Sequence, residues 1–131
     1  MFRPDIVPQV LPIPGGGLCL VFDDILLEPE RWRSRAAEFA AQFDPPQHNA
    51  YPGRELRLPD TVTAALLGMV SPWLRHHFGI ARIVDGYCRL SMVTLAPEQL
   101  TAAQSLCHRD RLQAPPGTLP LASVLYLFDD P

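Results

Sequence analysis

The stretch CHRD at residues 107–110, followed after a Pro/Gly-rich connector by LPLASVLYLF at residues 119–128, decides how the rest of the chain is interpreted. In an extended backbone, residues i and i+2 point to the same side, so His108 and Asp110 can direct an imidazole and a carboxylate toward one point. These are two of the three ligands of the 2-His-1-carboxylate triad that binds non-haem Fe(II). The third ligand would be a second histidine farther along, and residues 111–131 contain none.

The residue types alone leave other interpretations of this stretch open. His108 and Asp110 also fit a non-functional role as polar residues at the end of a strand, paired with a neighbouring arginine. The letters HRD also begin the catalytic loop of protein kinases. That class is excluded, because Arg111 and Pro115 replace the Leu and Asn of the kinase motif and the chain contains no lysine.

The length and composition predict a single globular domain over residues 1–131. Apolar residues make up 47% and charged residues 19% of the sequence, values that disfavour a disordered chain. The net charge of −3 and the absence of a basic run argue against a nucleic-acid partner. All 11 basic residues are arginine, which excludes sites that need a lysine, such as a Walker-A phosphate loop or a Schiff base.

The cysteines and the N-terminus bear on the cellular location. Cys19, Cys88 and Cys107 are widely spaced and form no CxxC pair, which favours reduced thiols over a disulfide framework. Prolines interrupt the N-terminal residues, which therefore do not resemble a signal peptide. No segment has the length and apolar character of a transmembrane helix. We therefore expect a cytoplasmic protein without a membrane partner.

Two helices are predicted in the first 80 residues. Residues 28–43 begin with acidic residues and a proline and carry apolar residues at spacings of three and four. Residues 60–78 form a second apolar stripe, which Pro72 is expected to kink or restart and Gly79 to end. The predicted core residues on these stripes are Trp32, Phe39, Phe43, Leu66, Met69 and Trp73.

Strands are predicted before and after these helices. The runs rich in strand formers are residues 18–22, 81–84, 87–95 and 119–128. Asp85-Gly86 lies between two of them and is a hairpin signal. Residues 1–17 are predicted to be a Pro-rich lead that ends in a flexible turn at residues 15–17, and residues 97–105 a polar connector. The two helices precede most of the predicted strands, and this order indicates an α+β fold.

The segment HNAYPGR at residues 48–54 is predicted to be a loop. Tyr-Pro-Gly is a turn sequence, in which proline sets one φ and glycine supplies a positive one. His48, Tyr51 and Arg54 are therefore candidates for the rim of a substrate site. A plain surface turn without a functional role is the alternative.

The chain resembles the 2-oxoglutarate/Fe(II)-dependent dioxygenase superfamily, and within it the bacterial DUF6445 group of oxygenase-like proteins. The resemblance covers most of the chain and rests on short pieces whose order is specific. They are VFDDIL at residues 21–26, YPGR at 51–54, LSMVTL at 90–95 with Pro97 and Gln99, HRD at 108–110 and VLYLF at 124–128.

This resemblance implies a double-stranded β-helix, or jelly-roll, core with the helices packed outside it. It implies that His108 and Asp110 bind Fe(II), and that 2-oxoglutarate and O₂ are co-substrates in a hydroxylation-type oxidation. It also implies that Tyr126 contacts 2-oxoglutarate. The sequence does not reveal the primary substrate, and we expect a small molecule or an amino-acid-type group. Cys107 departs from the pattern, since proline more often precedes the first ligand.

The family's Gly-Gly-Thr turn, its distal histidine and the basic residue that pairs with 2-oxoglutarate are all expected beyond Pro131. The chain is therefore expected to hold a truncated, N-terminal part of the catalytic fold, whose exposed sheet edges favour self-association. Two function classes stay open: an iron oxygenase that is incomplete here, and a non-catalytic fragment or binding protein that keeps the scaffold without a complete metal site. If the third ligand lies within the chain, His48 is preferred over His76 and His77, which diverge on the second helix.

Overall fold

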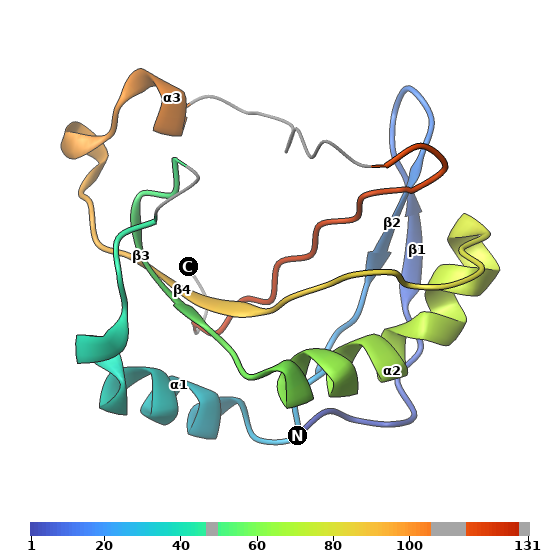
Figure 1. Cartoon of the computed structure of the whole chain (residues 1–131), viewed down its shortest axis with the longest axis horizontal. Coiled ribbons are helices and arrows are strands. Elements are labelled where there is room, and N and C mark those ends of the chain that lie inside the picture. The colour runs from blue at the N-terminus through green and yellow to red at the C-terminus, as the bar shows by residue number, and fades with distance from the viewer. Residues whose placement is uncertain (47–49, 106–114, 129–131) are drawn as a thin grey trace. The chain divides into compact units, whose positions relative to one another are not determined.

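The structure is a computed structural model, and it describes residues 1–46, 50–105 and 115–128 (Figure 1). In these residues the chain forms two antiparallel sheets of two strands each and three α-helices, a mixed α/β content that agrees with the predicted class of elements. The strands are β1 Gln9–Pro12, β2 Leu18–Val21, β3 Gly53–Arg57 and β4 Arg89–Val93. The helices are α1 Pro29–Glu38, α2 Asp60–Phe78 and α3 Ala102–Ser105, with short 3₁₀ helices η1 Ala40–Gln42 and η2 Pro97–Gln99.

The chain divides into two compact units, each assembled from two stretches of sequence. The first unit consists of Met1–Ser34 and Leu58–Cys88, and the second of Arg35–Arg57 and Arg89–Pro131. The backbone therefore passes between the units three times, and α1 contains one of these crossing points.

The first unit contains a hairpin of which the sequence predicted only one strand. β2 confirms the predicted strand at residues 18–22, and β1 pairs with it antiparallel, with Gln9 opposite Val21. β1 lies in the Pro-rich lead, where no strand was predicted. The turn between the strands holds three consecutive glycines, residues 15–17, and all three have positive φ, a conformation that other residues rarely adopt.

The N-terminal residues pair with the segment that precedes α1. The Arg3 N–H donates to the Ile25 carbonyl at 3.0 Å, and the Leu27 N–H donates to the Met1 carbonyl at 3.2 Å. Ile25 and Leu26 are buried beside this pairing. Burial of their aliphatic side chains stabilises this corner by about 1.5–3 kcal/mol each relative to leaving them exposed.

α2 is one continuous helix, as its apolar stripe predicts, and Pro72 does not divide it. The helix ends at Gly79, which adopts the left-handed conformation with φ of 65°. The Gly79 N–H donates to the Arg75 carbonyl at 3.1 Å and so satisfies one of the free carbonyls of the last turn. Basic residues in that turn also complement the negative end of the helix dipole.

A polar contact joins the start of α2 to the segment that precedes β4. Thr63 is buried, and its hydroxyl accepts a hydrogen bond from the Cys88 N–H at 3.1 Å. The Cys88 carbonyl accepts another from the Leu58 N–H at 2.9 Å. The predicted strand at residues 81–84 is wrong, since residues 79–88 contain no strand, and the hairpin expected around Asp85-Gly86 does not form.

The second unit is built around β3 and β4, which pair antiparallel over their full length. On the other edge of β3, Asp44 and Glu55 exchange two backbone hydrogen bonds of 3.0 and 2.8 Å. Gly53 is the first residue of β3. A Cβ atom at this position would lie 1.8 Å from the carbonyl oxygen of Met92, so the close approach of the two strands requires glycine here. The loop predicted for residues 48–54 is therefore wrong at its end, where β3 begins.

The predicted core is confirmed most clearly at Phe43, whose side chain is 2% exposed. The helix expected over residues 28–43 ends earlier, at Glu38, and η1 completes the stretch. The other predicted core residues are half-buried: Trp32, Phe39, Leu66, Met69 and Trp73. Trp32 stacks on Phe2 with ring centroids 6.2 Å apart.

The last predicted strand, residues 119–128, is not a strand in the structure. In Figure 1 its orange-to-red trace carries no arrow, because no ladder of backbone hydrogen bonds joins it to another described residue. The connector expected over residues 97–105 contains η2 and α3. None of the helices within the described ranges combines the length and the apolar character needed to cross a membrane.

Candidate functional site

The predicted iron ligands His108 and Asp110, and the rim candidate His48, lie outside the described residues. In residues 1–46, 50–105 and 115–128, no three His, Cys, Asp or Glu side chains are grouped closely enough to hold a metal ion. His76 and His77 contact each other edge to face with centroids 4.6 Å apart, and His77 also stacks on the ring of Trp73. Both rings therefore make aromatic contacts near the C-terminal end of α2.

Tyr51 lies beside an ion pair of the second sheet. The Arg89 Nε is 3.1 Å from the Glu55 Oε1, and the Glu55 side chain is only 14% exposed. Burial and the Glu55 carboxylate raise the pKa of Tyr51 above its ordinary value of 10.0, although the Arg89 guanidinium lowers it in part. Tyr51 is therefore a protonated hydroxyl at neutral pH, held next to one acidic and one basic group.

Arg54, the other described rim candidate, does not share this environment. It precedes Glu55 in β3, and successive side chains of a strand point to opposite faces. Its Nη1 donates to the carbonyl of Phe43 at 3.5 Å, a long hydrogen bond. The structure therefore separates Tyr51 and Arg54, which the sequence placed on one rim.

One face of the second sheet carries both signs of charge. Arg57 lies directly opposite Arg89, and Asp44 lies opposite Glu55 on the other edge of β3. Like charges directly opposite are destabilising, and the diagonal pair of Glu55 with Arg89 offsets this repulsion. We call the face formed by Asp44, Tyr51, Glu55, Arg57 and Arg89 the polar face of the β3–β4 sheet. With two acidic and two basic groups, it suits a ligand that carries both charges or none.

Three residues of the polar face, Glu55, Arg57 and Arg89, are site candidates that the sequence did not predict. The available signal was that RELR and RLS each place a leucine between polar residues, a partial alternation that is typical of a half-exposed strand. That alternation does not reveal which strands pair. The pairing alone brings Arg89 to Glu55 across more than 30 residues of sequence.

Tyr126 lies on the exposed segment at residues 119–128. Its side chain is 70% exposed, and its ring contacts the ring of Phe128 with centroids 5.3 Å apart. Its hydroxyl is therefore accessible to a ligand. Its distance from His108 falls outside the described residues.

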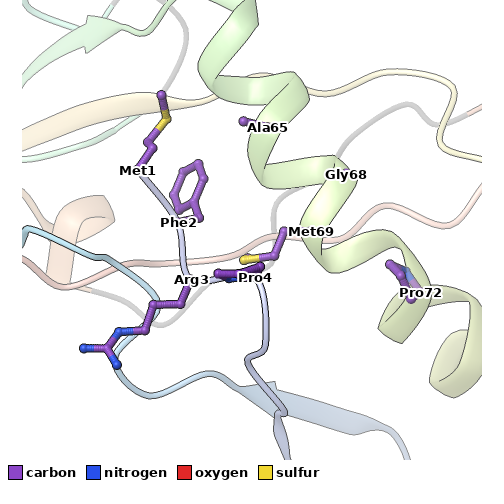
Figure 2. A pocket seen from close by; sticks show the side chains of 8 residues that line it. All are labelled: Met1, Phe2, Arg3, Pro4, Ala65, Gly68, Met69 and Pro72. Atoms are coloured by element: carbon purple, nitrogen blue, oxygen red, sulfur yellow. The ribbon is translucent and has the colours of Figure 1, made fainter.

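A groove that the sequence did not predict lies in the first unit, between the N-terminal residues and α2 (Figure 2). Its volume is about 450 Å³, and residues 1–4 form one wall. The α2 wall consists of Ala65, Gly68, Met69 and Pro72. Figure 2 shows the Arg3 side chain extending away from α2, so the charged group does not point into the groove. The surface of the groove is more apolar than polar.

Residues 4–131 match the family described as "Family of unknown function (DUF6445)". The chain belongs to the DUF6445 family. No curated protein and no solved structure matches the chain. The match covers nearly the whole chain of this DUF6445 protein, both units included.

The described residues of this DUF6445 protein therefore supply a polar face and an exposed tyrosine. The two residues that the sequence predicts as metal ligands, His108 and Asp110, carry an imidazole and a carboxylate, which are donor types that bind Fe(II). The donor chemistry thus fits iron.

Proposed function

We propose that this DUF6445 protein is a non-haem Fe(II)- and 2-oxoglutarate-dependent oxygenase, in which His108 and Asp110 are two of the protein ligands to iron. The observation that carries the proposal is the donor set itself, an imidazole and a carboxylate two residues apart. The order of the surrounding sequence pieces supports it. A double-stranded β-helix core is part of the proposal, with β3 and β4 as two of its strands.

Each of the proposed site residues has a distinct task. His108 binds iron through a neutral ring nitrogen, and Asp110 binds it through a carboxylate oxygen. The exposed hydroxyl of Tyr126 donates a hydrogen bond to a carboxylate of 2-oxoglutarate. The chemistry that the bound iron and co-substrates supply is a hydroxylation-type oxidation of the substrate.

The polar face of the β3–β4 sheet is proposed to bind the substrate. Tyr51 remains protonated at neutral pH, so it can donate a hydrogen bond. Acidic and basic groups alternate beside it, which suits a small molecule or an amino-acid-type group that carries both an ammonium and a carboxylate. His48 remains a candidate for the rim of the same site, whereas Arg54 lies on the other face of β3.

The test measures iron binding and turnover separately, with the protein as its gene encodes it. We expect Fe(II) binding by anaerobic equilibrium dialysis, and succinate formation that requires Fe(II) and 2-oxoglutarate. His108→Ala and Asp110→Ala should weaken iron binding by at least the roughly 10- to 100-fold that even supporting residues contribute. Tyr126→Phe should weaken 2-oxoglutarate binding and leave iron binding unchanged.

The matched controls are His76→Ala and Asp85→Ala, which remove the same two kinds of group from exposed positions of the first unit. Both controls should bind iron like the unmodified protein. If His108→Ala and Asp110→Ala bind iron as well as the controls do, the oxygenase proposal is wrong. Iron-independent binding of a small ligand would then favour the second class, a non-catalytic binding protein on the same scaffold.

A further inference from the structure

The feature that carries a further inference is the order of the charges on the polar face of the β3–β4 sheet. The acidic residues Asp44 and Glu55 are partners across one edge of β3 and exchange two backbone hydrogen bonds. Two residues farther along β3, Arg57 is the direct partner of Arg89 on β4. Residues two apart on a strand share one face and are about 7 Å apart. The face therefore carries an acidic row and a basic row, one strand repeat apart.

An ion pair links the two rows. The Arg89 Nε lies 3.1 Å from the Glu55 Oε1, and the Glu55 side chain is only 14% exposed. This pair neutralises one charge of each row and fixes the positions of its two side chains. The other two charged residues, Asp44 and Arg57, are exposed, and all four residues belong to the second unit. The face thus presents a carboxylate on the acidic row and a guanidinium on the basic row.

We propose that the polar face selects a zwitterionic substrate whose ammonium and carboxylate are about one strand repeat apart, with the ammonium at Asp44 and the carboxylate at Arg57. This inference rests on the proposed function, in which the face binds the substrate, and it specifies the class of that substrate. An ammonium donates hydrogen bonds to a carboxylate, and a carboxylate accepts two parallel N–H bonds from a guanidinium. A ligand with a carboxylate alone would gain the contact with Arg57 and would be repelled by Asp44, so both charges are needed.

The distance between the rows distinguishes classes of amino compound. In an α-amino acid both charged groups are bonded to one carbon, which puts the nitrogen and the carboxyl carbon about 2.5 Å apart. Each further residue of an extended peptide adds about 3.5 Å, so the charged ends are about 6 Å apart in a dipeptide and about 9.5 Å apart in a tripeptide. The straight ω-amino acid δ-aminovalerate has as many bonds between its charged ends as a dipeptide. The spacing of a dipeptide is the one that matches the two rows.

The test is an NMR titration of the backbone amides of the unmodified protein, without iron or 2-oxoglutarate. The probes are glycine, glycylglycine and triglycine. We expect glycylglycine to bind about fivefold more tightly than either of the others, which is the upper value for one exposed ion pair. Salt at about 1 M should remove this preference, because it shortens the Debye length to about 3 Å. δ-Aminovalerate should also bind more tightly than glycine, and its comparison with glycylglycine shows whether the substrate is an ω-amino acid or a dipeptide.

Two variants assign the ends of the ligand. Asp44→Asn and Arg57→Gln should each weaken glycylglycine binding by up to about fivefold. Acetylated glycylglycine keeps the carboxylate and lacks the ammonium, so it should lose affinity in Arg57→Gln and not in Asp44→Asn. The matched controls are Arg54→Gln, on the other face of β3, and Asp5→Asn, an exposed position of the first unit. Both controls should bind glycylglycine like the unmodified protein.

The inference and the oxygenase proposal fail in different experiments. Equal binding of glycine and glycylglycine, equal binding of triglycine, or no binding of any probe would overturn the inference. A loss in Arg54→Gln as large as that in Arg57→Gln would also overturn it, because the site would then not lie on the polar face. The oxygenase proposal is judged separately, by iron binding and succinate formation, neither of which enters this titration.

Discussion

For single residues, backbone geometry explains why glycine is required at one position and not at another. Gly53 and Gly68 show the contrast. A Cβ atom at residue 53 would lie 1.8 Å from the carbonyl oxygen of Met92, whereas a Cβ at residue 68 would meet no atom within 4 Å. One glycine is needed for the close approach of two strands, and the other is not needed sterically.

Gly53→Ala and Gly68→Ala should therefore change stability in opposite directions. We expect Gly53→Ala to lower the free energy of unfolding by about 1–3 kcal/mol, because β3 and β4 must move apart. Gly68→Ala should raise it by about 0.5–1 kcal/mol, since alanine favours a helix over glycine. Urea unfolding of both variants checks this pair, and equal effects would contradict the geometry of β3.

A second prediction at this scale concerns Tyr51 and pH. Its pKa is raised in the folded protein, mainly by burial, so folding favours the protonated hydroxyl. The stability that this provides is complete below about pH 10 and is lost as the pH rises through the raised pKa. Tyr51→Phe should therefore lose less stability than the unmodified protein between pH 9 and strongly alkaline pH. Urea unfolding of both proteins at a series of pH values checks this difference.

At the scale of elements, individual contacts hold α2 and the η1 region in place. Thr63 is a buried polar residue of α2, and its hydroxyl accepts the Cys88 N–H. Thr63→Val should cost about 1–3 kcal/mol of stability, because it leaves that N–H without its partner. The control is Thr61→Val in the same helix, where the side chain is exposed. A comparable loss in both variants would show that helix propensity, not the hydrogen bond, is responsible.

Phe43, directly after η1, is the most buried large side chain of the described residues. Phe43→Ala should lower the free energy of unfolding by about 3–5 kcal/mol, since it removes a buried ring and leaves a cavity. Phe128→Ala, which truncates an exposed ring, should change it by less than about 0.5 kcal/mol when measured in dilute solution. Thermal or urea unfolding checks both, and a small effect at residue 43 would remove it from the core.

At the scale of the whole molecule, the two units are interleaved in sequence. Because the backbone passes between them three times, neither unit can form as a continuous piece of chain. We therefore expect one cooperative unfolding transition. Trp32 and Trp73 both belong to the first unit, so their fluorescence reports on it. Phe43→Ala, in the second unit, should shift that fluorescence transition and the circular-dichroism transition together. Separate transitions would show that the units unfold independently.

Sequence signals were sufficient to predict the elements that local interactions specify. The apolar stripe and Gly79 predicted α2 and its end, and the strand formers at residues 18–22 predicted β2. These signals suffice because helix hydrogen bonds and caps join residues close in sequence. The sequence also supplied the His-x-Asp pair at residues 108–110 and the resemblance to DUF6445, to which the chain belongs.

The strand pairings and the polar face depend on residues that are distant in sequence, and only the tertiary structure shows them. β3 exists because Gly53 permits close approach to β4, and the polar face exists because that pairing brings Arg89 to Glu55. Residues 119–128 are rich in strand-forming residues, yet they do not form a strand. The physical reason is that a strand, unlike a helix, takes its hydrogen bonds from another segment, and propensity alone cannot supply that partner.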